Sequence, residues 1–231
     1  MRYREGPIID VGANVGQTMF DVLCVDARRT YVGFEPNPRC AEILQSIIIS
    51  NGLTNCTVVP AALWSGFAVR NLQVSRLVAF TPRASLMPEL LPLHFSYTRP
   101  TICMPLDQAA TFLGVRNLGV VKIDAESAEL EVIDGMASML ERWRPPIICE
   151  VLRPVRGTDQ RIHAKRALQL REIIDKMDYG IFSIVKPRSG PPTIHPVREF
   201  PGDTWSLLKW GQNDYLFIPS EQAEDAAANI S

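Results

Sequence analysis

Amphipathic helical patterns and short apolar runs alternate along most of the chain. Two helical patterns cover residues from about 15 to 27 and a long segment that ends near residue 178. The clearest one lies between them and is stopped by Asn51-Gly52. Five of its residues recur at intervals of three and four and so share one helical face: Cys40, Ile43, Leu44, Ile47 and Ile48.

Seven apolar runs, most of them rich in β-branched residues, predict strands between and after these helices. They lie at 8–11, 30–35 and 56–63, at the start of 119–136, and at 145–152, 180–185 and 213–219. Strands that alternate with helices are typical of βαβ units and a parallel sheet. The pattern therefore predicts an α/β fold.

Residues 65–105 break this alternation. The runs 67–75 and 77–80 are compatible with an antiparallel excursion, whereas the proline-spaced stretch 81–100 reads as an ordered loop. We interpret 65–105 as an insertion or a substrate cover within a single domain that spans residues 1–219. The remaining tail, 220–231, is expected to be frayed.

Composition narrows the classes of partner and compartment. The 231 residues are 46% hydrophobic, and 24 basic side chains against 25 acidic ones give a net charge of -1. A chain with so little net charge has no overall electrostatic attraction for nucleic acid or an anionic membrane. No apolar run approaches the roughly 18 residues that are needed to cross a bilayer. The five cysteines lack metal-ligand spacing, so we expect reduced thiols, no metal and a cytoplasmic protein.

The stretch "PIIDVGANVGQTMF" at 7–20 carries the first candidate site. Gly12 and Gly16 follow an apolar strand, where bare backbone amides at a helix N-terminus can receive a ligand. Glu35 ends the second strand 19 residues after Gly16, where a carboxylate can accept both ribose hydroxyls. Dinucleotide enzymes share these features, but their GxGxxG pattern has a glycine where this chain has Asn14. A ligand with an amino acid moiety, such as S-adenosylmethionine (SAM), suits the turn better.

At this point the sequence resembles the FkbM-type methyltransferases, which are SAM-dependent and have the class I fold. The similar segments cover most of residues 7–151 in the expected order: "IIDVGANVGQT", "VGFEPNPRCAEILQ", "TVVPAAL", "RASL", the "LD" of "MPLDQ", "VVKIDAESAELEVIDGM" and "PIICEV". One departure is Ser127, which stands in "DAESAE" where the family usually has glycine. Family members also commonly have helical sequence upstream, so part of the usual cover is expected to be absent or supplied by another element.

The resemblance implies a Rossmann-like class I methyltransferase fold, with a mostly parallel seven-stranded sheet and helices on both faces. It also implies which residues bind SAM. Glu35 would hold the ribose hydroxyls, and Asp124 would lie beside the cofactor. The remaining residues would surround the methionine portion (Asp10, Gly12, Ala13, Asn14, Gly16, Gln17 and Thr18), flank the adenosine (Pro36 and Asn37) and border the adenine (Ala61 and Ala62).

A base must accept the proton of an alcohol as the alcohol is methylated, and it must lie at the carboxyl ends of the strands. Asp124 is the first candidate, followed by Glu150 and Glu126. Two alternatives remain open: Glu126 and Glu129 can stabilise a helix N-terminus, or three carboxylates can gather a divalent cation.

Substrate contacts are predicted from basic side chains. Arg153 and Arg156 follow the fifth strand and are candidates to bind an anionic acceptor, and His94 in the proline-rich loop is a candidate to reach the site. The other histidines, His163 and His195, are expected on solvated surfaces.

Together these features predict a SAM-dependent O-methyltransferase that acts on a hydroxyl of a small molecule, such as a sugar or a polyketide-like metabolite. The alternatives are a nicotinamide-dependent oxidoreductase and a SAM- or nucleotide-binding module without catalysis. Self-association into a homo-oligomer is compatible with the sequence, whereas nucleic-acid and membrane partners are not expected.

Overall fold

The protein is described by a computed structural model that covers residues 5–75, 84–91, 95–154, 158–187, 189–202 and 213–223. Within these ranges eight strands form one sheet in the order β11-β10-β12-β9-β8-β1-β2-β3. Their bounds are β1 Ile8–Val11, β2 Tyr31–Phe34, β3 Cys56–Val59, β8 Val120–Ile123, β9 Ile147–Glu150, β10 Tyr179–Val185, β11 Thr193–Pro196 and β12 Asp214–Pro219.

The predicted α/β class is confirmed, but the predicted count of seven mostly parallel strands is wrong. Strands β3, β2, β1, β8 and β9 are mutually parallel, whereas β12 pairs antiparallel with both β9 and β10, and β11 pairs antiparallel with β10. The additional strand is β11, a short edge strand beside two prolines at 191–192. Prolines are tolerated at a sheet edge and read as a loop in the sequence, so the pattern missed this strand.

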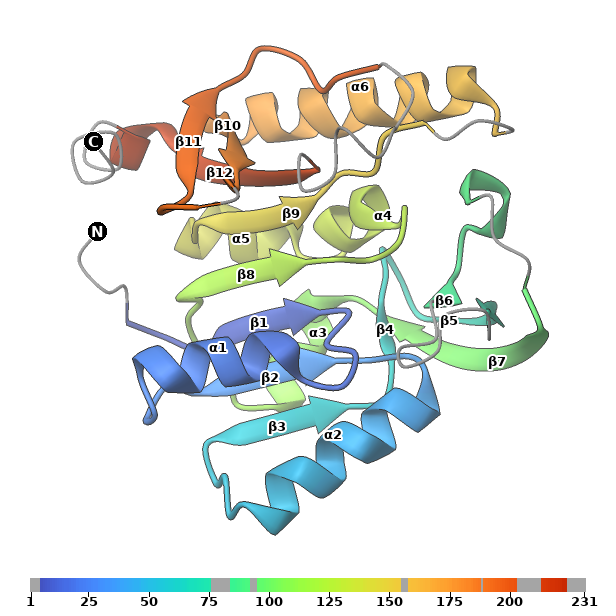
Figure 1. The fold of residues 1–231 in the computed structure, drawn as a ribbon, viewed down its shortest axis with the longest axis vertical. Helices are drawn as coiled ribbons and strands as arrows, with labels where there is room; N and C mark the ends of the chain where they lie inside the picture. The colour runs from blue at the N-terminus through green and yellow to red at the C-terminus, as the bar shows by residue number, and fades with distance from the viewer. Residues whose placement is uncertain are drawn as a thin grey trace.

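Helices cover both faces of the large sheet, with α1 in front of it and α3 and α5 behind it in Figure 1. Asn37 caps α2, and Asp159 caps α6, each through a side-chain oxygen that accepts a backbone N–H two residues on. The helices are α1 Gln17–Val25, α2 Pro38–Ser50, α3 Leu106–Phe112, α4 Glu129–Asp134, α5 Ala137–Trp143 and α6 Gln160–Lys176.

A second sheet accounts for most of the described residues between 62 and 104. It has four strands in the order β4-β7-β5-β6: β4 Ala62–Leu63, β5 Ala68–Val74, β6 Ala84–Ser85 and β7 Tyr97–Met104. A short 3₁₀ turn, η1 Pro88–Leu90, precedes β7. The run 56–63 is therefore not one strand, because the chain leaves the large sheet after β3 and β4 pairs with β7. Figure 1 places this second sheet beyond the carboxyl ends of β1 and β8.

The main core lies on the parallel strands. Ile9, Phe34, Val121, Ile123 and Ile147 are all fully buried. Burial on this scale contributes about 1.5–3 kcal/mol for each large apolar side chain. The core fixes the parallel strands in register and so holds their carboxyl ends at one edge, where the candidate site begins.

Among the described residues no helix is both long and apolar enough to cross a membrane. Four of the five cysteines are buried free thiols, while Cys24 on α1 is exposed. Burial raises the pKa of the Cys40 thiol to about 12, which keeps it protonated.

Candidate active site

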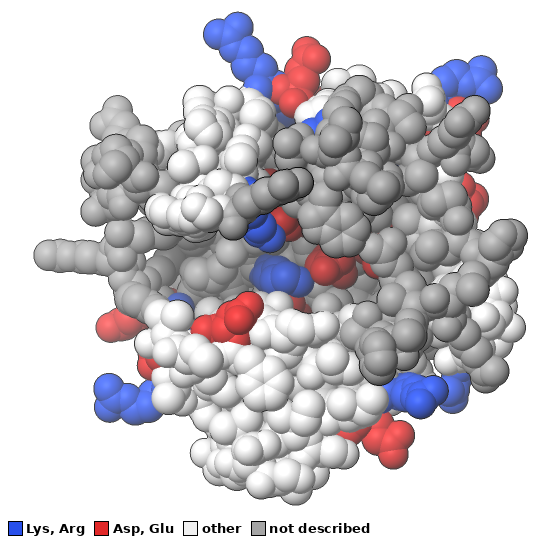
Figure 2. Space-filling view, viewed as in Figure 1, with Lys and Arg blue, Asp and Glu red and all other residues white. Residues whose placement is uncertain are grey.

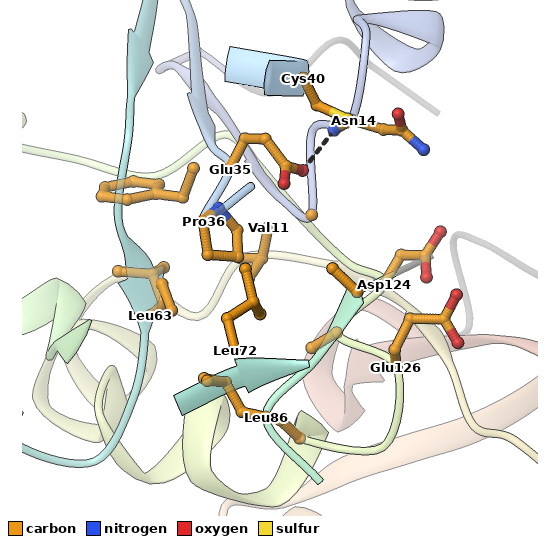
Figure 3. Close-up of a pocket in the computed structure, with 16 residues that line it drawn as sticks. Val11, Asn14, Glu35, Pro36, Cys40, Leu63, Leu72, Leu86, Asp124 and Glu126 are labelled. Carbon is orange, nitrogen blue, oxygen red and sulfur yellow. Dashed lines mark hydrogen bonds between the residues drawn. The ribbon is translucent and has the colours of Figure 1, made fainter. Parts of the chain in front are cut away.

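A cavity opens where the carboxyl ends of β1, β2 and β8 meet the second sheet. Its volume is about 100 Å³. Sixteen residues line it: Val11, Gly12, Asn14, Phe34, Glu35, Pro36, Cys40, Ala62, Leu63, Leu72, Ala84, Leu86, Asp124, Ala125, Glu126 and Ala128. Figure 3 shows the carboxylates of Asp124 and Glu126 on one side of the cavity, away from the apolar side chains of Leu63, Leu72 and Leu86.

Backbone geometry explains both glycines of the turn, for different reasons. Gly12 has φ +81°, and a Cβ there would lie 2.0 Å from the carbonyl oxygen of Asp124. Gly16 has φ +100°, and its Cβ would lie 2.6 Å from a methyl carbon of Leu44 in α2. Gly12 therefore allows the ends of β1 and β8 to approach at the cavity, whereas Gly16 allows close packing against a helix and does not line the cavity.

Glu35 is a buried carboxylate at the cavity, 6% exposed. Its Oε2 accepts a hydrogen bond of 2.7 Å from the backbone N–H of Asn14, and its Oε1 accepts one of 2.7 Å from that of Asn37 (Figure 3). Burial raises the pKa of Glu35 to about 7, even though the two backbone donors favour the charged form. Each oxygen still has a lone pair for a further donor.

Asn14 adds an acceptor of its own. Its backbone has φ +48°, and its side-chain Oδ1 is buried without a hydrogen-bond partner. A buried acceptor without a donor is costly unless a ligand or water satisfies it. Glu35 presents acceptors at the cavity, which suits a ligand rich in hydrogen-bond donors.

Asp10 does not line the cavity and is instead part of a buried ionic network beneath it. It accepts a hydrogen bond of 2.6 Å from the hydroxyl of Tyr31, and the Nζ of Lys122 lies 3.4 Å from its Oδ1. Lys122 also lies 3.6 Å from Oδ2 of Asp124. These carboxylates raise the pKa of Lys122 against the opposing effect of burial.

Other predicted cofactor residues lie around the turn without lining the cavity. Gln17 is exposed at the start of α1, Asn37 is buried as the N-cap of α2, and Ala61 is buried before β4. Ala13 and Thr18 also lie outside the lining, with Ala13 buried. The predicted residues that do line it are Gly12, Asn14, Glu35, Pro36, Ala62 and Asp124. Whether each contacts the cofactor stays a prediction.

The three predicted catalytic carboxylates come together at the ends of β8 and β9. Asp124 and Glu126 line the cavity, and the side chain of Asp124 is 39% exposed. The Glu150 carboxyl hydrogen-bonds to Asp124, and burial together with the negative charge of Asp124 raises the pKa of Glu150 to about 9. The raised pKa favours the neutral form of Glu150.

Arg153 is the one predicted substrate residue within the described ranges, and it lies outside the cavity. Arg153 is 8% exposed, while His94 and Arg156 lie outside the described residues. His163 is buried, so its expected place on a solvated surface is wrong, whereas His195 is exposed. Figure 2 shows basic and acidic side chains together in the central hollow of one face, with no large patch of one sign in the described part of that face.

Two features of the site were missed from the sequence. Lys122 carried a signal, because a single charged residue inside the apolar run "VVKI" needs a partner when the strand is buried. The apolar wall of Leu72, Ala84 and Leu86 carried none, because it forms through pairing within the second sheet. No group of three or more histidine, cysteine, aspartate or glutamate side chains in the described ranges is arranged to hold a metal ion.

The parallel strands, the cavity at their carboxyl edge and the buried Glu35 are compatible with the class I methyltransferase fold that the sequence resemblance implied. The family model for the methyltransferase FkbM domain matches residues 10–181. The chain therefore belongs to the FkbM methyltransferase family, as the sequence resemblance implied.

Solved structures with a similar fold include an FkbM methyltransferase from Methylobacillus flagellatus KT. Its TM-score is 0.55 at 15% sequence identity, and the match covers 92% of this chain and 43% of that one. A SAM-dependent O-methyltransferase from Thermotoga maritima matches with a TM-score of 0.40 at 14% identity, over 93% of this chain and 59% of that one. The chain thus spans less than two thirds of either protein. No curated protein matches it.

Proposed function

We propose that the chain is an O-methyltransferase that transfers the methyl group of SAM to a hydroxyl of a small molecule, with sugars and polyketide-like metabolites as the first classes to test. The observation that carries the proposal is the position of Asp124. It lies at the cavity, in contact with Lys122 and Glu150, on the strand next to the one that ends in the Gly12 turn.

The residues at the cavity fit SAM. Glu35 has one free lone pair on each oxygen for the two ribose hydroxyls, and the unpartnered Oδ1 of Asn14 can accept from a hydroxyl or an ammonium group. Gly12 and Pro36 also line the cavity, as the family resemblance implied for cofactor contacts. Bound SAM supplies an electrophilic methyl group on a sulfonium, which an oxygen nucleophile can attack.

Asp124 would accept the proton that the hydroxyl of the acceptor releases. The Nζ of Lys122 lies 3.6 Å from Oδ2 of Asp124, and Glu150 hydrogen-bonds to Asp124, so both groups hold its carboxylate in place at the cavity. Alignment of the acceptor oxygen by the cavity walls supplies a further part of the rate. Glu126 is the second carboxylate at the cavity and is a candidate to bind a second hydroxyl.

The second sheet would cover the acceptor. Leu72, Ala84 and Leu86 give the cavity an apolar wall, which supports an acceptor with an apolar face as well as hydroxyls. An anionic group on the acceptor, bound by Arg153 and Arg156, and self-association of the chain remain further proposals.

The test is methyl transfer from isotopically labelled SAM to panels of sugars and hydroxylated polyketides. We expect label in at least one hydroxylated compound with the wild-type chain. Transfer should fall at least a hundredfold in Asp124→Asn, whereas binding of S-adenosylhomocysteine (SAH) should change less than fivefold. Glu141→Gln, an exposed site on α5, is the matched control. Full activity in Asp124→Asn would contradict the assignment of the base, and label only in amines would contradict O-methylation.

A further inference from the structure

The segment 124–128 contains two consecutive residues in the left-handed region of the backbone. Glu126 has φ +47° and Ser127 has φ +82°. This conformation is unfavourable for residues with a Cβ, so surrounding contacts must maintain it. The segment matters for the cavity, because Asp124, Ala125, Glu126 and Ala128 all line it.

Arg166 of α6 holds this segment from outside the cavity. Its guanidinium donates to the carbonyl oxygen of Ser127 at 2.9 Å and to both carboxylate oxygens of Glu131 at 2.8 and 2.5 Å. The side chains of Arg166 and Glu131 are each 18% exposed. Because the planar guanidinium is fixed by two bonds to Glu131, the second N–H of Nη2 is directed at the carbonyl oxygen of Ser127.

Two further bonds fix the same segment. The backbone N–H of Ser127 donates to Oε1 of Glu129 at 3.0 Å, and Oγ of Ser85, in the second sheet, donates to the carbonyl oxygen of Glu126 at 2.9 Å. The left-handed pair is therefore held from α4, α6 and the second sheet. Among these groups only Arg166 donates a charged hydrogen bond to the backbone of the pair.

We propose that Arg166 is a positioning residue for the cofactor cavity. It keeps Glu126 and Ser127 in the left-handed conformation, and so keeps the wall formed by 124–128 in the shape that binds SAM. This inference rests on the proposed function, which assigns the cavity to SAM. A purely structural alternative is that Arg166 only joins α6 to Glu131 of α4 and stabilises the fold without affecting the cavity.

A double-mutant cycle separates these two roles. The variants are Arg166→Ala, Ser127→Gly and the combination, and the measurement is the Kd of SAH by calorimetry well below each melting temperature. We expect Arg166→Ala to weaken SAH binding about tenfold, because a segment that contains Ser127 can then relax. Ser127→Gly alone should bind within threefold of wild type. The combination should also return to within threefold, because glycine adopts φ +82° without help from the guanidinium.

Arg171→Ala is the matched control, because Arg171 lies on the same helix and its Nε bonds to Asp175 at 2.7 Å, outside the segment 124–128. It should leave the Kd unchanged. If Arg166→Ala does not fold, Arg166→Lys replaces it, since lysine keeps the charge but lacks the two nitrogens that bind Glu131 and Ser127 at once, and the same rescue is expected.

An unchanged Kd in Arg166→Ala overturns the proposal. A weakened Kd that Ser127→Gly does not restore also overturns it, because the loss then comes from a route other than the left-handed pair. If the wild-type chain itself fails to bind SAH, the proposed function fails and this inference falls with it.

Discussion

The substitution Glu35→Gln tests how the cavity would hold the ribose. Both oxygens of Glu35 accept backbone N–H groups at 2.7 Å, and glutamine can replace only one of these acceptors. Its NH₂ group would face one of the two backbone donors and could not accept from a ribose hydroxyl. The loss of one hydrogen bond to a charged group corresponds to about 2 kcal/mol, which is about 30-fold in Kd.

The pH dependence of binding sharpens this prediction. Because burial raises the pKa of Glu35 to about 7, the free carboxyl is largely protonated at pH 5.5. Ribose hydroxyls bond best to the ionised form, so SAH affinity should rise as pH increases to about 7. Between pH 5.5 and 7.5 the wild-type Kd should tighten about 20- to 30-fold. Glu35→Gln should lose this dependence.

Calorimetric titration with SAH at pH 5.5, 6.5 and 7.5 measures both effects. Glu42→Gln, an exposed residue on the helix that follows Glu35, is the control and should behave as wild type. The reasoning is refuted if Glu35→Gln binds SAH within threefold of wild type at pH 7.5. It is also refuted if the wild-type Kd is constant across this range.

Gly12→Ala would place its Cβ 2.0 Å from the carbonyl oxygen of Asp124, so we expect a loss of about 2–4 kcal/mol in unfolding free energy and at least tenfold in SAH affinity. Gly52→Ala, with φ +62° and open space around it, should lose only about 1 kcal/mol, and equal losses in the two variants would contradict the steric argument. Glu129→Gln tests a buried acid whose pKa burial raises to about 7. Since this folded pKa lies above the usual value of 4.5, the wild-type chain loses stability as pH rises from about 4.5 to 7, by up to about 3 kcal/mol. Chemical unfolding at pH 5 and pH 8 measures the free energy of unfolding. Relative to wild type, Glu129→Gln should be more stable at pH 8 than at pH 5, and a stability difference that does not change with pH would argue against this origin. For any acceptor found, Arg153→Ala should raise the KM without changing SAH affinity if the acceptor is anionic; an unchanged KM counts against an anionic acceptor.

The parallel half of the fold and the centre of the cavity follow from local patterns in the sequence. Each βαβ unit places the residue after its strand at the carboxyl edge of the sheet, so Gly12, Glu35 and Asp124 could be predicted to converge. The helix over 40–51 was equally predictable, because its apolar residues share one face and Asn51-Gly52 ends it.

The rest of the fold could not be predicted, because it depends on strand pairing between residues far apart in the sequence. The second sheet depends on β5 and β7, which pair antiparallel across a separation of more than twenty residues, so no local pattern identifies their register. The apolar wall of the cavity could not be predicted from the sequence for the same reason. His163 read as a surface residue on an amphipathic helix, but α6 packs it inward. A Cβ on Gly16 would meet Leu44, which the sequence did not reveal, and the predicted contact of Gly16 with a ligand stays a prediction.

The most direct test of the central claim is calorimetric titration of the purified chain with SAM, SAH and NAD under one set of conditions. The account predicts that SAM and SAH bind at one site per chain, that NAD does not bind, and that Glu35→Ala abolishes binding of both adenosyl ligands. Binding of NAD alone, or no binding of either SAM or SAH, would contradict it.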